Sequence, residues 1–259
     1  MKGLVLSAGY GERLRPLTET TPKPILEVGG RPLTHYPLMM LKRAGISEIA
    51  INLHHLADEI EATLGDGAAL GLRITYSRER KLAGTGGPLV MLRDYFGGEP
   101  FVLLNCDTIL DLDLAAMIGF HRERAGMATL VLRPGGDPDA YSRIECDATG
   151  RIRRMRLLRG RTPGDFVDYP PALDAKVAEA LTPFMYCGVM ICEPEALAMT
   201  PAALPFSLMG DFFAPLVARG VPQFGYVHRG FFRTVDDLQG YEAVRREFAS
   251  APPPLAFLR

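Results

Sequence analysis

The stretch GLVLSAGYGERLRPLTETTPKP, residues 3–24, decides the interpretation of this chain. It opens with a short apolar run, Gly3–Ser7, which has the length and composition of a buried β-strand. Gly9 and Gly11 follow, and glycine lets a backbone approach a ligand closely and turn its N–H groups toward phosphate oxygens. The stretch then adds three cations to a chain whose net charge is only -1: Arg13, Arg15 and Lys23. A strand, a glycine loop and clustered positive charge together predict a polyphosphate site.

Two common nucleotide-binding motifs do not fit this loop. A dinucleotide fingerprint requires a third glycine where the chain has Leu14, and it requires an acidic residue after the second strand, which is missing. A Walker loop requires a Gly-Lys dipeptide, which the sequence lacks. For the two glycines alone, a plain strand-to-loop turn stays open as the alternative.

The composition is that of a globular enzyme, with 47% apolar and 23% charged residues among 259. A balance of 29 basic and 30 acidic residues argues against a general nucleic-acid or membrane-surface binder. The apolar run at the amino terminus is too short for a signal peptide, and residues 196–210 are too few to span a bilayer. The four cysteines lie far apart with no histidine at ligand spacing, which argues against a zinc site or disulfide framework. We therefore expect a cytoplasmic protein.

Apolar runs of strand length alternate with segments of helical period, which predicts an α/β fold with a mostly parallel sheet. The strands expected in the first half are Gly3–Ser7, Glu48–Leu53, Arg73–Ser77, Phe101–Leu104 and Ala128–Leu132. The helices expected between them, each followed closely by a glycine, are Thr34–Ala44, Leu56–Leu64, Gly87–Tyr95 and Leu114–Ala125. The second half reads as the strands Ser142–Cys146, Arg151–Leu158, Phe184–Ile191 and Gln223–His228, with helices near Asp211–Ala218 and Asp236–Phe248.

No break rich in Gly, Ser or Pro separates the two halves, so we expect one continuous domain over residues 1–249. The rhythm of the elements changes near residue 133. The tail, residues 250–259, contains three consecutive prolines that cannot continue a helix, and we expect a loose or surface-draped end.

The string from Gly9 to Pro24 closely resembles the signature loop of the sugar-1-phosphate nucleotidyltransferases, or NDP-sugar pyrophosphorylases. That loop reads Gly-x-Gly-x-Arg-Leu-x-Pro-Leu-Thr followed by Pro-Lys-Pro, and the chain matches it at every defined place. The chain looks most like short members such as mannose-1-phosphate guanylyltransferases and N-acetylmuramate-1-phosphate uridylyltransferases. The resemblance implies a Rossmann-like, glycosyltransferase-A-type fold with a mixed, mainly parallel central sheet and helices on both faces. Residues 1–133 would then bind the nucleotide and residues 134–249 the sugar.

The reaction that the resemblance implies is Mg²⁺-dependent transfer of a nucleotidyl group from a nucleoside triphosphate to a sugar 1-phosphate. Arg13 would contact the phosphates, and Lys23 would sit at the reacting α-phosphate. Such transfers are catalysed mainly by positioning and charge neutralisation, which suits a guanidinium fork and a mobile ammonium. The turn Leu82–Gly87 resembles the family's turn against the nucleobase, although Thr85 could instead cap the following helix. The nucleotide-binding residues implied are Ala8, Gly9, Gly11, Glu12, Gly84 and Thr85.

The carboxylates implied as metal ligands come from two distant segments. Asp107 follows an apolar strand, at the edge where open α/β sheets bind ligands, and the resemblance makes it a catalytic Mg²⁺ ligand. The family's second aspartate, in Trp-x-Asp-Ile-Gly-Thr-Pro, is replaced here by Thr234. The register of the related glucose-1-phosphate cytidylyltransferases places it on Asp236 instead. Asp237 then remains as a helix cap.

The sugar side departs further from the family pattern. Tyr141 stands at the family's Tyr-Gly, with Ser142 in place of the glycine, and Gly188 fits the strand that lines the sugar pocket. The Glu-Lys-Pro that supplies a lysine to the sugar phosphate is missing. Six arginines offer themselves as a replacement clamp or as the solvated face of a strand: Arg151, Arg153, Arg154, Arg156, Arg159 and Arg161.

Several choices stay open. GTP or UTP is the favoured nucleotide, and CTP with glucose 1-phosphate is an alternative pair. A regulatory paralogue that binds a nucleotide or an NDP-sugar without turnover is the rival of another class, because of Thr234 and the missing lysine. Such domains often pair, so a homodimer stays open, and neither nucleic acid nor membrane is expected as partner. Histidine is left out of the mechanism, because the adjacent His54 and His55 are not expected to face one site.

Overall fold

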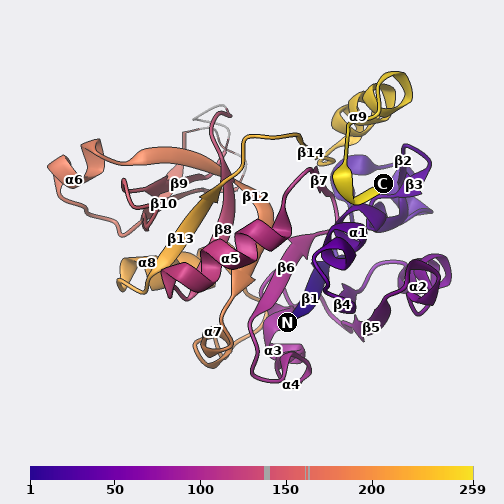
Figure 1. The fold of residues 1–259 in the computed structure, drawn as a ribbon, viewed down its shortest axis with the longest axis horizontal. Helices are drawn as coiled ribbons and strands as arrows, with labels where there is room; N and C mark the ends of the chain where they lie inside the picture. The colour runs from indigo at the N-terminus through magenta and orange to yellow at the C-terminus, as the bar shows by residue number, and fades with distance from the viewer. Residues whose placement is uncertain (137–140, 161, 163, 259) are drawn as a thin grey trace. The chain divides into compact units, whose positions relative to one another are not determined.

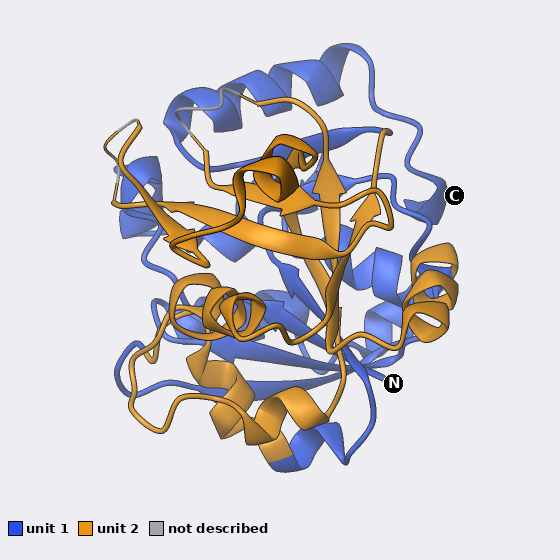
Figure 2. Ribbon diagram, turned by 90° about the vertical axis from the view of Figure 1, so that its left-hand side faces the viewer, with its two compact units in different colours: residues 1–82, 94–115, 230–259 blue, residues 83–93, 116–229 orange. Residues whose placement is uncertain are grey.

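A computed structural model of the chain describes residues 1–136, 141–160, 162 and 164–258. Its internal contacts divide the chain into two compact units, neither of them continuous in sequence (Figure 2). Unit 1 comprises residues 1–82, 94–115 and 230–259, and unit 2 comprises residues 83–93 and 116–229. The division of roles between residues 1–133 and 134–249 stays a prediction.

Unit 1 is built on four parallel strands, which Figure 1 shows in indigo to magenta. Their order is β6 (Phe101–Asn105), β1 (Lys2–Leu6), β4 (Glu48–Leu53) and β5 (Arg73–Arg78). The crossovers carry α1 (His35–Arg43), α2 (Ala57–Leu64) and η4 (Ala68–Leu70), because parallel neighbours need a long connection. The interiors of β1, β4 and β6 are buried and, apart from Asn52, apolar, as is usual for strands covered on both faces, whereas the edge strand β5 exposes residues such as Thr75. Leu6 pairs with Asn105, so the loops that follow β1 and β6 leave the same edge side by side.

Two short antiparallel pairs complete unit 1. One joins β2 (Glu27–Val28) to β3 (Arg31–Pro32), and the other joins β7 (Thr108–Leu110) to β14 (Phe232–Thr234). The second pair brings a late segment of the chain beside the strand that follows Asp107. The helix α9 (Leu238–Ser250) begins directly after it.

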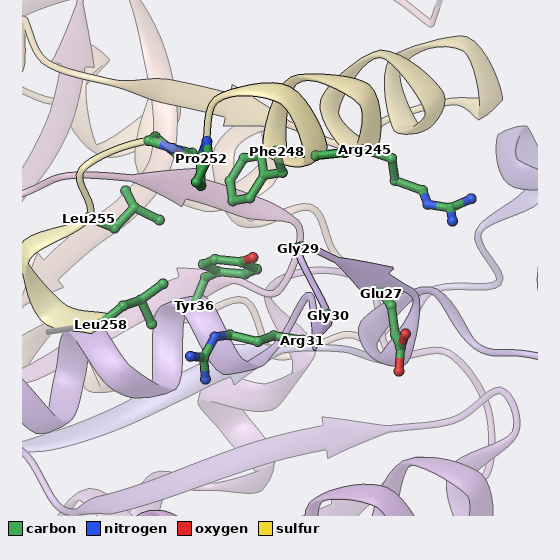
Figure 3. Close-up of a pocket in the computed structure, with 12 residues that line it drawn as sticks. Glu27, Gly29, Gly30, Arg31, Tyr36, Arg245, Phe248, Pro252, Leu255 and Leu258 are labelled. Atoms are coloured by element: carbon green, nitrogen blue, oxygen red, sulfur yellow. The ribbon is translucent and has the colours of Figure 1, made fainter.

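The proline-rich tail is anchored in unit 1 rather than loose. Leu255 and Phe257, the latter in η6 (Ala256–Leu258), are buried, and Arg43 donates a hydrogen bond to the Ala256 carbonyl at 2.6 Å. Figure 3 shows the cavity of about 580 Å³ that the tail encloses with Tyr36 and Phe248. Apolar side chains after the prolines therefore hold the tail down, although the prolines themselves exclude a helix.

Unit 2 contains six strands that pair in the order β11 (Phe166–Tyr169), β10 (Ile152–Leu158), β9 (Arg143–Cys146), β12 (Thr182–Cys192), β8 (Ala128–Arg133) and β13 (Gln223–Val227). Every pair is antiparallel except β8 with β13. Its helices are α3 (Gly87–Met91), α5 (Leu114–Arg124), α6 (Ala175–Glu179), α7 (Glu195–Ala198), the π-helical η5 (Leu208–Phe213) and α8 (Ala214–Ala218). The two units together confirm the predicted α/β class with a mixed sheet.

The observed helices differ from the predicted ones mainly where tertiary contacts determine where a helix begins or ends. The helix expected over Gly87–Tyr95 is divided into α3 and α4 (Arg93–Phe96). The helix expected near Asp211 begins earlier, where the Ser207 hydroxyl accepts the Gly210 N–H at 3.1 Å. Within the described part of the chain, no helix combines the length and apolar character that a bilayer crossing requires.

Candidate active site

The loop after β1 folds back on itself around Gly11. This residue has φ +64°, and a Cβ there would lie 2.8 Å from Thr18 Cγ2, so glycine is required. The Gly11 carbonyl accepts hydrogen bonds from the Leu14 N–H and the Thr18 hydroxyl, each at 2.8 Å. Three short 3₁₀ turns follow: η1 (Glu12–Leu14), η2 (Leu17–Glu19) and η3 (Lys23–Ile25). The turns shorten the segment, so that Lys23 returns to the sheet edge.

Lys23 meets Asp107 at that edge. The Lys23 ammonium donates to Asp107 Oδ2 in a direct ion pair, with side chains only 14% and 16% exposed. Burial lowers the pKa of Lys23, but the attraction and hydrogen bond of Asp107, together with the charge of Asp236, outweigh it and raise the pKa above the ordinary 10.5. Lys23 is therefore a fully charged ammonium at neutral pH, ready to face an anionic ligand.

A second ion pair joins Arg13 to Asp236. Arg13 Nη2 lies 3.0 Å from Asp236 Oδ1, with side chains 49% and 38% exposed. The Val235 N–H donates to the Asp107 carbonyl at 3.1 Å, and this ties the Asp236 segment to the Asp107 segment. Asp237 caps α9 by accepting the Gly240 N–H at 2.7 Å, as predicted.

Two cations and two carboxylates predicted from three separate segments thus form one cluster in unit 1. Thr234 lies in β14 opposite Thr108, so Asp236 is the carboxylate of this segment that enters the cluster. The structure brings these residues together, while their catalytic and metal-binding roles remain predictions. The loop residues Ala8, Gly9 and Glu12 lie in the same segment between β1 and η1.

The histidine pair after β4 is a feature that the sequence interpretation missed. His54 Nε2 lies 3.0 Å from the Tyr10 hydroxyl, and His55 Nε2 lies 2.8 Å from the Thr18 carbonyl. Both histidines therefore contact the loop after β1, and the expectation that they cannot face one site is wrong. The residues lie in a turn, where the strict alternation of a strand does not apply. The sequence signal for this contact is the pair of adjacent histidines directly after a buried strand.

The turn Leu82–Gly87, which belongs to unit 2 from Ala83 onward, owes its small residues to its own fold. A Cβ on Gly84 would lie 2.2 Å from the Phe206 carbonyl oxygen. The Thr85 hydroxyl accepts the Leu208 N–H at 2.8 Å, and the N-cap of α3 is Gly86, so Thr85 is not the helix cap. Contact of Gly84 and Thr85 with a nucleobase stays a prediction.

The predicted sugar-side residues also lie in unit 2. Tyr141 is 48% exposed and borders a hollow of about 220 Å³ with Ser142 and Phe184. Gly188 is buried and has φ 73°, at the point where β12 changes register against β8. The place of Tyr141 is consistent with a pocket wall, and sugar binding by Tyr141 or Gly188 stays a prediction.

Most of the arginines that follow Gly150 have partners within unit 2. Arg154 pairs with the buried Glu145 at 2.6 Å, and Arg156 pairs with Asp168 at 2.8 Å. Arg153 lies 3.4 Å from Asp147, and Arg151 donates to the Gly220 carbonyl at 2.9 Å. These four arginines stabilise the sheet, which supports the interpretation of a strand face. Arg159 is exposed, and Arg161 lies outside the described residues.

A comparison with known proteins agrees with the class that the fold and the cluster define. The profile of the family described as Nucleotidyl transferase matches residues 2–156, more than half of the chain. The chain therefore belongs to the nucleotidyl transferase family, which confirms the resemblance of the signature loop.

The relatives are sugar-phosphate enzymes by name. The chain is 32% identical over 235 residues to a UTP–glucose-1-phosphate uridylyltransferase from Synechocystis sp., covering 86% of this chain and 56% of that protein. It is 48% identical over 119 residues to an N-acetylmuramate α-1-phosphate uridylyltransferase from Neisseria meningitidis serogroup B, covering 45% and 51%. It is 34% identical over 159 residues to mannose-1-phosphate guanyltransferase beta-B from Xenopus laevis, covering 60% and 44%. The chain thus spans about half the length of these relatives.

Solved structures confirm the predicted fold. A Bacillus anthracis protein assigned as a glucose-1-phosphate thymidylyltransferase matches with a TM-score of 0.75 at 20% identity, over 100% of this chain and 99% of its own. HddC from Yersinia pseudotuberculosis, complexed with GMP-PN, matches with a TM-score of 0.73 at 20% identity, over 95% and 99%. At this identity the match concerns the fold alone.

Proposed function

We propose that this chain transfers a nucleotidyl group from a nucleoside triphosphate to a sugar 1-phosphate. The observation that carries the proposal is the cluster in unit 1, where Lys23 meets Asp107 and Arg13 meets Asp236. An oxygen of the sugar phosphate attacks the α-phosphorus, the bond from that phosphorus to the oxygen bridging the β-phosphate breaks, and pyrophosphate leaves. The attacking phosphate is already ionised at neutral pH, so no general base is needed.

Each residue has a role that its surroundings favour. Lys23, held charged by Asp107, neutralises the α-phosphate as negative charge redistributes. Arg13 is half exposed and can turn its guanidinium toward the phosphate chain. Ala8, Gly9, Gly11 and Glu12 form the loop around the triphosphate, and Gly84 and Thr85 lie against the base.

The cluster also suits a divalent cation. The negative charges of Asp107 and Asp236 both raise the pKa of Lys23, so both carboxylates lie close to this ammonium. Mg²⁺ commonly takes one or two carboxylates together with substrate phosphates. The donor set therefore fits an ion shared with the substrate, held by Asp107 and Asp236. When bound, Mg²⁺ would supply positive charge to the phosphate oxygens. Thr234 is the poorer ligand, because its hydroxyl is neutral.

UTP is the nucleotide we favour, followed by GTP, because two of the relatives named above are uridylyltransferases. N-acetylmuramate 1-phosphate, glucose 1-phosphate and mannose 1-phosphate are the sugars to test, and CTP with glucose 1-phosphate is the alternative pair. Tyr141 and Gly188 are proposed to line the sugar pocket.

Pyrophosphate release over a panel of triphosphates and sugar 1-phosphates, with Mg²⁺ and with EDTA, tests the proposal. We expect turnover with UTP that EDTA abolishes. Silence over the whole panel, with an NDP-sugar still raising the Tm, would support the non-catalytic binding protein instead. The same preparation in size-exclusion chromatography with light scattering tests the proposed homodimer. A cytoplasmic location is proposed from the four cysteines, all free and buried in the structure.

A further inference from the structure

A small network of hydrogen bonds and ring contacts connects the signature loop to the turn after β4. Tyr10, between the two glycines of the loop, is 40% exposed, and its ring centroid lies 5.4 Å from those of both His54 and His55. Its hydroxyl lies 3.0 Å from His54 Nε2. On the far side of that ring, His54 Nδ1 lies 2.8 Å from the Glu79 carbonyl oxygen. The chain of contacts therefore runs from the β5 end through His54 to the tip of the loop.

The hydrogen-bond roles in this network are determined by chemistry. A carbonyl oxygen can only accept, so His54 Nδ1 carries the proton that it donates to Glu79. In the neutral ring Nε2 is then the acceptor, and the Tyr10 hydroxyl donates to it. By the same reasoning His55 Nε2 carries a proton and donates it to the Thr18 carbonyl at 2.8 Å.

The base of the network is rigid and buried. The Asn52 side chain accepts the Ser7 N–H at 2.9 Å and donates to Glu79 Oε1 at 2.8 Å. Asn52 and Glu79 are 3% and 5% exposed. Leu56 has φ 49°, a left-handed conformation that is unusual for leucine and turns the chain sharply after the histidines. This sharp turn directly follows His54 and His55, which contact the loop at two separate places, Tyr10 and Thr18.

We propose that His54 and His55 are positioning residues that hold the signature loop in its triphosphate-binding shape before the nucleotide arrives. Two glycines beside Tyr10 leave the free loop many conformations, and ordering it on binding would weaken nucleotide affinity. The histidine pair pins the loop at Tyr10 and at Thr18 and removes part of that entropic cost in advance. This inference rests on the proposed function of the loop.

Replacing His54 by an amide side chain separates the roles of its two ring nitrogens, Nδ1 and Nε2. At position 54, His54→Asn keeps a donor near Nδ1 for the Glu79 carbonyl and loses the partner of Tyr10, whereas His54→Gln keeps a polar group near Nε2. Tyr10→Phe removes only the hydroxyl. Tyr76→Phe is the matched control, because the Tyr76 hydroxyl also donates one hydrogen bond, to the Gly65 carbonyl at 2.6 Å, but does so away from the loop.

Steady-state kinetics with the preferred substrate pair should show an effect on the nucleotide alone. One lost hydrogen bond corresponds to a KM for the triphosphate raised by roughly 3- to 10-fold in Tyr10→Phe and His54→Asn. We expect kcat and the sugar-phosphate KM to stay within about twofold, and His54→Gln to recover most of the loss. The double variant Tyr10→Phe/His54→Asn should be no worse than either single one, because both remove the same bond. Additive effects, or a loss in kcat alone, would overturn the inference.

Hydrogen exchange of the loop amides in the ligand-free protein provides a test that needs no turnover. Amides of residues 9–18 should exchange faster in Tyr10→Phe and His54→Asn than in wild type, and at the wild-type rate in Tyr76→Phe. Unchanged exchange rates in the loop variants would contradict the proposal that the histidines hold the loop. If the wild type turns over no substrate pair, the proposed function fails, while this measurement still decides whether the histidines order the loop.

Discussion

The two ion pairs of the candidate active site in unit 1 and two arginine pairs of β10 in unit 2 differ in how far apart in the sequence their partners lie. In unit 1, Lys23 and Asp107 are 84 residues apart, and Arg13 and Asp236 are 223 residues apart. In unit 2, Arg154 and Glu145 are 9 residues apart, and Arg156 and Asp168 are 12 residues apart, on neighbouring antiparallel strands. The long-range pairs join the turns after β1 to residues just beyond β6 and β14, where a ligand can replace each partner, whereas the local pairs stabilise a sheet. We infer that the two pairs of the candidate site serve chemistry and the two pairs of β10 serve stability.

The largest expected effect is the loss of turnover in Lys23→Ala. Removing a preorganised charge at the reacting phosphate should lower kcat by roughly 100- to 1,000-fold, as removal of an oxyanion donor does. The sugar-phosphate KM should change little, since the ammonium acts at the α-phosphate. Saturation kinetics in both substrates measure this effect, and a wild-type kcat would remove Lys23 from the mechanism.

Asp107→Asn should lower kcat by no more than Lys23→Ala does, and the activity that remains should no longer depend on Mg²⁺. Like Lys23→Ala, which leaves Asp107 without its ion-pair partner, it should also destabilise the fold by about 1–3 kcal/mol, because the buried Lys23 ammonium loses its partner. Urea unfolding and a Mg²⁺ titration of activity separate the two effects. Retained Mg²⁺ activation in this variant would assign the ion to other ligands.

Arg154→Met is the corresponding test in unit 2. Glu145 is only 7% exposed, so removal of its partner should cost about 3 kcal/mol of stability. Where the protein is still folded, kcat and both KM values should stay within about twofold. A selective rise in the sugar-phosphate KM would instead show that Arg154 replaces the missing lysine.

The smallest effects are expected at the exposed pair. Asp236→Asn should change the free energy of unfolding by less than about 1 kcal/mol, because both partners are well solvated. It should nevertheless raise the Mg²⁺ concentration needed for half-maximal activity. Adding Thr234→Asp to this variant should bring that concentration part of the way back to the wild-type value. If Asp236→Asn leaves the Mg²⁺ requirement unchanged, the second ligand lies elsewhere.

The sequence predicted unit 1 well because its determinants are local. A buried apolar strand, a turn that only glycine can make at Gly11 and an aspartate after β6 can all be recognised without knowing what they pack against. The parallel strands were found nearly to the residue, since continuous apolar runs and helix-ending glycines mark them. Asp237 as a cap was also predictable, because capping depends on the next three residues.

What the sequence could not show depends on tertiary contacts. The strands β7 and β14 are three residues each, and they form only because distant segments pair. The contacts of His54 with Tyr10 join positions 44 residues apart. Arginines that pair across a hairpin look the same in a sequence as arginines free to bind phosphate, which is why the clamp and the strand face stayed equal alternatives.

A crystal structure with Mg²⁺ and a non-hydrolysable UTP analogue tests the central claim most directly. The account predicts the triphosphate inside the loop of residues 8–18, with Lys23 Nζ and a metal bound to Asp107 both at the α-phosphate. A nucleotide bound with that loop uninvolved, or with Lys23 and Asp107 still paired only to each other, would contradict it.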